Sequence, residues 1–159
     1  MFDLTLALIV AAMAMNGVLA GASLDQSVKQ LPARNRIGGA AYSVYSRASD
    51  LGNGIAWYAA LGVGSALLTI IAAVVLYFQR ADSTAATPLY MAAVLSVLHS
   101  LVTARAAPLL MSQRRYNPNA EAEDPLKALF DRFARLQALR AFLQVLTFGL
   151  LLWTIVAWP

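Results

Sequence analysis

The 159-residue sequence contains no cysteine and a single histidine, His99. Without cysteine, the chain has no disulfide, no thiolate metal site and no cysteine nucleophile. One imidazole alone does not form a bis-histidine haem site and is a poor ligand set for a transition metal. We therefore expect no metal and no cofactor.

Charged residues are also scarce, at 13% of the chain, whereas hydrophobic residues make up 60%. Soluble domains carry about 25% charged residues, so the composition indicates that lipid is the main solvent of this protein. The formal net charge is +4, but no pattern of basic and aromatic residues points to nucleic acid as a partner. In a membrane protein, basic residues more often set the orientation of the chain.

Four apolar segments are long enough to cross a bilayer as helices. Each is close to the ~20 residues that span about 30 Å of hydrocarbon, and they cover residues 2–23, 55–78, 88–110 and 139–158. The sequence therefore predicts an all-α fold, an integral membrane four-helix bundle that forms a single domain over residues 1–159. The residues at 20–22 resemble a signal-peptide cleavage site, but no Lys or Arg precedes them. We therefore expect the first segment to be retained.

The Lys and Arg residues are divided unevenly between the connections. Eleven of the twelve lie in or beside the first and third connections, and only Arg80 lies in the second. The positive-inside rule then places both long connections in the cytoplasm and both termini on the outer, non-cytoplasmic side. We expect the protein to lie in the bacterial inner (plasma) membrane.

Both long connections are predicted to carry structure of their own. In the first, a polar segment broken at Pro32 follows the first span, and Gly38 and Gly39 precede a short cytoplasmic helix. In the second, apolar residues recur at helical spacing from Pro125 to Arg140. This amphipathic segment is expected to run without a break into the last span as its N-terminal extension.

Polar side chains within a membrane span are costly, which makes them candidates for function. On the last span, polar residues at 137, 140, 144 and 147 are spaced three, four and three apart, so they share one helical face that should point into the bundle. Hydrogen bonds between helices would also explain such residues. The candidate catalytic residues are His99, Asp25 and Arg140, and the candidate ligand-binding residues are Asn16, Asp50, Asn53, Arg105, Gln137 and Gln144.

Most of these candidates fall at the cytoplasmic ends of their helices, with His99, Asn16 and Gln144 deeper. This placement predicts a polar cavity that is open to the cytoplasmic side. Such a cavity would bind an apolar, aromatic or lipid-like small molecule. The protein would then act within the lipid bilayer either alone, as a homo-oligomer, or as an accessory subunit of a larger membrane assembly.

Short motifs at both ends of the chain resemble those of a known family. The first span contains a G-x-x-x-G at Gly17 and Gly21 and is followed by Leu31-Pro32, and the last begins with FDRFARLQALRAFLQ. This pattern resembles the anthrone oxygenase-like family of small four-helix integral membrane proteins, largely catalogued as a domain of unknown function. Where the family pattern has Asn three residues before an Arg, this chain has Gln137 before Arg140.

The resemblance implies an alternative function, a cofactor-independent oxygenase of polycyclic phenols. His99 or Asp25 would be the base that removes a proton from the substrate. Arg140 and Arg105 would hold the resulting anion. Whether the protein is an enzyme at all is left open by the sequence.

Overall fold

The computed structural model describes residues 3–79, 84–117 and 123–159, and within these ranges every regular element is helical. The predicted all-α fold is therefore confirmed. The elements in chain order are α1 (Leu4–Asp25), η1 (Gln26–Gln30), α2 (Leu31–Ile37), α3 (Gly39–Ala48), η2 (Ser49–Asn53), α4 (Gly54–Phe78), α5 (Ala86–Met111), η3 (Ser112–Arg115) and α6 (Glu123–Val156).

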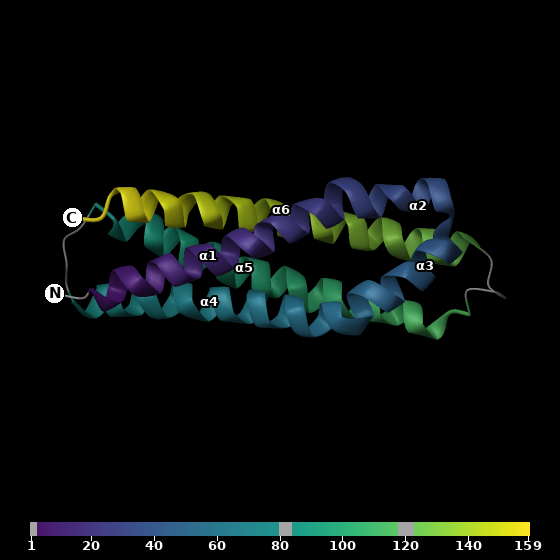
Figure 1. Ribbon diagram of the computed structural model, residues 1–159, viewed down its shortest axis with the longest axis horizontal. Helices are drawn as coiled ribbons and strands as arrows, with labels where there is room; N and C mark the ends of the chain where they lie inside the picture. Colours follow the sequence, from purple (N-terminus) through teal and green to yellow (C-terminus); the bar gives the residue numbers. More distant parts are fainter. Residues whose placement is uncertain (1–2, 80–83, 118–122) are drawn as a thin grey trace.

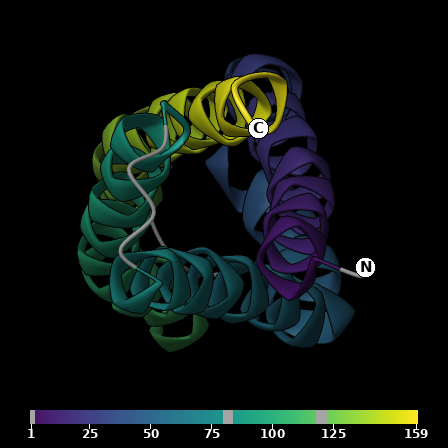
Figure 2. The same cartoon turned by 90° about the vertical axis from the view of Figure 1, so that its left-hand side faces the viewer.

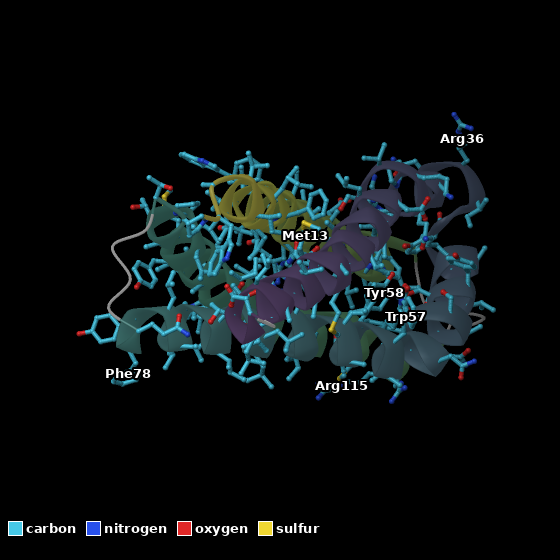
Figure 3. The ribbon with its side chains drawn as sticks, turned by 60° about the vertical axis from the view of Figure 1, so that its left-hand side comes forward. Met13, Arg36, Trp57, Tyr58, Phe78 and Arg115 are labelled. Carbon is cyan, nitrogen blue, oxygen red and sulfur yellow. The ribbon has the colours of Figure 1, made fainter. Side chains whose placement is uncertain are left out.

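The four long helices form a closed ring in the order α1, α4, α5, α6, each packing against its two neighbours (Figure 2). α1 begins and α6 ends at the same end of the bundle, and α2 and α3 lie at the other end (Figure 1). Figure 3 shows the side chain of Arg36 projecting away from the α2–α3 end, while Phe78 lies at the opposite end. The bundle thus has a basic end, formed around α2 and α3, and an apolar end at the termini.

All four helices are long and apolar enough to cross a membrane, as predicted. The longest unbroken helix, α6, has 34 residues, or about 51 Å at 1.5 Å per residue. A hydrocarbon core is only about 30 Å thick, so part of the bundle extends beyond the apolar layer. Large apolar side chains on its outer surface are exposed, among them Val18, Val63, Val94, Phe142 and Trp153.

Two clusters of buried apolar residues fill the bundle interior, one toward each end. The cluster near the termini joins all four long helices and includes Ile9, Ala72, Leu89 and Leu151. The cluster near the basic end is centred on Tyr42, Phe130 and Phe133, and the rings of Tyr42 and Phe130 meet edge to face with centroids 4.9 Å apart. The polar residues of α5 and α6 lie between these two clusters.

The predicted break at Pro32 is absent. Pro32 lies in the first turn of α2, where proline is tolerated, and the π-helical segment η1 connects α1 to α2 without interrupting the helix. The wider π turn accommodates the proline ring, which in a regular α-helix would clash with the carbonyl group four residues earlier.

Two other local predictions are confirmed. A short helix, α3, follows Gly38, whose φ of 85° is the left-handed conformation that favours glycine. The amphipathic segment and the last span form one helix, α6. The π-helical segment η2 joins α3 to α4 and contains a kink at Gly52, where φ is −88° and ψ is −120°.

Candidate functional site

The polar face predicted on α6 points into the bundle. Gln137, Gln144 and Thr147 are buried and Arg140 is half-buried. Nε2 of Gln137 donates to the carbonyl oxygen of Ser23 on α1 at 3.4 Å. Nη1 of Arg140 donates to Oε1 of Gln137 at 2.8 Å, so the amide of Gln137 orients the guanidinium group from one side.

His99 on α5 is held by two donors on one ring nitrogen. The amide nitrogen of Gln144 lies 2.7 Å from His99 Nε2, and the hydroxyl of Thr103 lies 3.3 Å from the same atom. With the Gln144 amide in this orientation, its N–H donates to an unprotonated Nε2 and the neutral imidazole carries its proton on Nδ1, which leaves the buried Oε1 of Gln144 without a partner in the described residues. Nδ1 has no hydrogen-bond partner among the described residues and is therefore a donor without an acceptor.

Asp50 belongs to a network of buried hydrogen bonds that joins four segments, α3, η1, η2 and η3. Ser46 donates to Oδ2 of Asp50 at 2.7 Å, and Gln26 donates to Oδ1 at 3.1 Å. Gln113 in η3 donates to Ser46 at 3.1 Å and accepts from Ser43 at 3.1 Å. Gln26 lies in η1 and Asp50 in η2, so the two π-helical segments meet at this carboxylate. π-helical turns are frequent at functional sites.

A cavity of about 390 Å³ brings three of the predicted residues together: Asp50, His99 and Arg140 line it. Most of its other lining is apolar, with Ile55, Ala59 and Val63 on α4 and Ala104, Ala107, Leu110 and Met111 on α5. A cavity therefore lies at three of the predicted residues, but its lining is apolar with a few polar groups and not polar throughout, and the opening to the cytoplasmic side stays a prediction.

The cavity opens through the side of the bundle between α4 and α5. Ala59 on α4 and Ser100 and Ala104 on α5 both line the cavity and are exposed. These side chains are small, and the two helices are therefore not closed against each other at this depth. Tyr58, which also lines the cavity, is turned inward, whereas its neighbour Trp57 is exposed on the surface (both are labelled in Figure 3).

The cavity walls carry one cation and one carboxylate that are not paired with each other. Within the described residues, the ion pairs are Lys29–Asp25 and Arg34–Asp131, so neither Arg140 nor Asp50 has an oppositely charged partner at ion-pair distance. Nε of Arg140 is buried and has no hydrogen-bond partner in the described part of the chain. The cation is thus satisfied only in part, by the amide of Gln137. A half-buried guanidinium without a counter-ion is energetically costly.

The remaining predicted residues lie outside the cavity lining. Asp25 pairs with Lys29 and accepts from Gln30 at 2.6 Å, and Asn53 and Arg105 are exposed. Asn16 is buried, and its Oδ1 has no hydrogen-bond partner within the described residues. Gln137 and Gln144 do not line the cavity, but each bonds to a residue that does. Gln137 orients Arg140, and Gln144 orients His99.

Sequence reasoning missed several polar residues of the site. Tyr58 is typical of an interfacial aromatic belt by its position, yet it lines the cavity. Ser46 and Gln113 lie in segments that the sequence assigns to connections, and they are fully buried. The spacing of Ser46 and Asp50, four residues apart on one helical face, is the one sequence signal that links this network to the site.

Among the described residues, no group of three or more His, Asp and Glu side chains is placed to hold a metal ion. The sequence matches no protein-family model, and no curated protein or solved structure matches it.

Proposed function

We propose that this protein is an integral membrane protein whose cavity binds an amphiphile with an anionic headgroup. The observation that carries the proposal is Arg140, a half-buried cation without a carboxylate partner in the described residues, on the wall of a largely apolar cavity. An anionic oxygen would make a charge-assisted hydrogen bond with the guanidinium group. His99 Nδ1–H would donate to a second acceptor of the same ligand.

The apolar part of the ligand is matched by the opening between α4 and α5. Ligand pockets of about 300–1,000 Å³ bury most of a small molecule, so a cavity of about 390 Å³ holds a headgroup and the beginning of a chain. The rest of the chain would leave between the small side chains of Ala59 and Ala104 and lie in the bilayer. The ligand would therefore enter from the lipid and would not need to cross water.

The distribution of basic residues supports an orientation for this site. Eleven of the twelve Lys and Arg residues lie toward the α2–α3 end, and Arg80 lies outside the described residues. By the positive-inside rule, this end is cytoplasmic, both termini are on the outer side, and the ligand belongs to the cytoplasmic leaflet of a bacterial inner membrane.

The proposal is tested by native mass spectrometry of the full chain purified in mild detergent. We expect an anionic amphiphile to remain bound to the wild-type protein and to be lost from Arg140→Gln. The matched control is Arg135→Gln, because Arg135 lies on the same helix but is exposed. Equal occupancy in all three proteins, or no retained amphiphile in the wild type, contradicts the proposal.

A second candidate function is a cofactor-free oxygenase of polycyclic phenols, in line with the resemblance of the chain to anthrone oxygenase-like proteins. The presence of His99 on the cavity wall favours it. In such a reaction a ring CH₂ group would lose two hydrogens and gain one oxygen atom of O₂, and the other oxygen atom would leave as water. The lone pair of His99 Nε2 is occupied by Gln144 and Thr103, so His99 would have to exchange these bonds before acting as a base.

The two candidates are separated by incubating the purified protein with anthrone and O₂. The oxygenase function predicts quinone formation that is lost in His99→Ala and in Arg140→Gln. If the rate equals that of a heat-inactivated sample, the oxygenase function is excluded and amphiphile binding is unaffected.

A further inference from the structure

The order of polar groups along the cavity wall follows from three hydrogen bonds. Asp50 is at the level of Gln26 in η1, and Gln137 is at the level of Ser23 on α1, three residues nearer the apolar end. Arg140 is three residues beyond Gln137 along antiparallel α6. At 1.5 Å per residue, these two steps of three residues separate the backbone levels of Asp50 and Arg140 by about 9 Å. The Arg140 guanidinium reaches back toward Gln137 and therefore lies between these two levels.

His99 lies deeper again. It bonds to Gln144, which is one helical turn beyond Arg140, or about 6 Å at 1.5 Å per residue. From the basic end inward, the cavity therefore presents a carboxylate at Asp50, a guanidinium at Arg140 and an imidazole N–H at His99. The opening between α4 and α5 lies beside these groups, because Ala104 is five residues nearer the basic end than His99 on α5.

We infer that the ligand is an aminophospholipid, whose ammonium group pairs with Asp50 and whose phosphodiester pairs with Arg140. Such a lipid carries a primary ammonium, a phosphodiester, an ester carbonyl and acyl chains in that order from its polar tip. The cavity presents a carboxylate, a guanidinium and an imidazole in the order of the first three groups, and the acyl chains would leave sideways through the opening beside Arg140. This inference rests on the proposed function and specifies its headgroup: the phosphodiester is the anionic group that Arg140 binds, and the ammonium makes the headgroup zwitterionic.

The hydrogen-bond network around Asp50 supports a role for its negative charge. Every member of the network is buried, and Ser46 and Gln26 both donate toward the carboxylate. Burial raises the pKa of Asp50, and the two donors offset this only in part. A ligand cation would favour the charged form, and each carboxylate oxygen can accept a further bond. Burying a carboxylate at a cavity wall without a cation is costly unless a ligand cation completes the site.

Binding of defined phospholipids to the delipidated, detergent-purified full chain tests the inference. Native mass spectrometry would measure the affinities for phosphatidylethanolamine, phosphatidylglycerol and phosphatidylcholine with identical acyl chains. We expect phosphatidylethanolamine to bind about tenfold more tightly than either of the others, because only its headgroup offers N–H donors to Asp50. Asp50→Asn is expected to remove the preference while retaining phospholipid binding. Asp25→Asn is the matched control, because Asp25 is a carboxylate at the same level that does not line the cavity.

A series on the unaltered protein gives a second test that does not depend on how the variant folds. Stepwise N-methylation of phosphatidylethanolamine removes the N–H donors one at a time, and affinity should fall at each step. If the wild type binds all three lipid classes equally, or if Asp50→Asn keeps the preference, the aminophospholipid inference is overturned while the anionic amphiphile stands. If no phospholipid binds and Arg140→Gln changes nothing, the proposed function fails as well.

Discussion

The amide nitrogen of Gln144 lies 2.7 Å from Nε2 of His99, across the interface between α6 and α5. The contact joins the one histidine of the chain to the buried polar face of α6. With the amide in this orientation the lone pair of Nε2 is used, and the ring proton is on Nδ1. This assignment separates a binding role for His99 from a role as a general base.

The tautomer of His99 is directly measurable, and the chain contains no other histidine. In ¹⁵N NMR spectra at neutral pH, we expect Nδ1 to be protonated and Nε2 to be unprotonated and hydrogen-bonded. Gln144→Leu removes one donor and should shift the Nε2 resonance toward that of a free ring nitrogen. Gln30→Leu, a change on the surface of η1, should leave it unchanged. A proton on Nε2 in the wild type would show that the assignment is wrong.

The two glycines of the G-x-x-x-G motif are predicted to respond differently to alanine. A Cβ at Gly17 would lie 2.9 Å from the ring of Phe148, whereas a Cβ at Gly21 would meet nothing within 4 Å. Gly17→Ala should therefore destabilise the bundle by about 1–3 kcal/mol through overpacking. Gly21→Ala should be neutral or stabilising by up to about 1 kcal/mol, because alanine favours helix. Unfolding in mixed micelles with SDS would measure both.

A double variant distinguishes overpacking from a general effect on α1. Phe148→Leu removes the ring that the new methyl group contacts, so it should recover most of the stability lost in Gly17→Ala. If Gly17→Ala and Gly21→Ala cost the same, the close approach of α1 to Phe148 is not the reason for glycine at 17.

The apolar cluster at the basic end gives a second stability test. Phe130 is fully buried and meets Tyr42 edge to face, so Phe130→Ala should cost about 3–5 kcal/mol. Phe142 on the same helix is exposed on the outer surface, and Phe142→Ala should cost far less in detergent. Equal losses in the two variants would argue against the packing of α6 on α3.

Closing the opening between α4 and α5 should block the ligand without disturbing the polar groups. Ala104→Phe places a large ring at the mouth of the cavity and should lower amphiphile occupancy by about tenfold or more, equivalent to a loss of about 1.4 kcal/mol. Val97→Phe is the control, because Val97 is exposed on α5 and does not line the cavity. Occupancy is measured by extraction and quantification of bound lipid. Unchanged occupancy in Ala104→Phe would place the entrance elsewhere.

Much of the fold could be predicted because membrane helices follow from length and hydropathy alone. The predicted span 55–78 corresponds to α4 (Gly54–Phe78), and the amphipathic segment before residue 139 is part of α6, as expected. The polar face of α6 could be predicted because its spacing fixes one side of a helix. The continuation through Pro32 could not be predicted, because it depends on a π-helical turn that has no pattern in the sequence.

The site was less predictable, because its groups come from connections as well as spans. Asp50, His99 and Arg140 line one cavity. They could be identified from the sequence because charged and imidazole side chains are rare in or beside apolar segments. Asp25, Asn53 and Arg105 are also polar residues close to the ends of apolar segments, so the sequence does not distinguish them from the cavity residues. They lie outside the cavity lining, because side chains near a helix end can project in several directions. The network through Ser46 and Gln113 requires α3 to fold back beside η3, a tertiary contact that no local pattern encodes.

The central claim is that an anionic amphiphile occupies the cavity between α4 and α5, and photo-crosslinking tests it most directly. A phosphatidic acid with a diazirine near the start of one acyl chain would be irradiated with the membrane-reconstituted protein, and the labelled peptides would be mapped. We predict labels on residues 55–63 of α4 and 100–111 of α5, reduced in Arg140→Gln but not in Arg135→Gln. Labels spread evenly over the exposed faces of all four long helices, and unchanged in Arg140→Gln, would contradict the account.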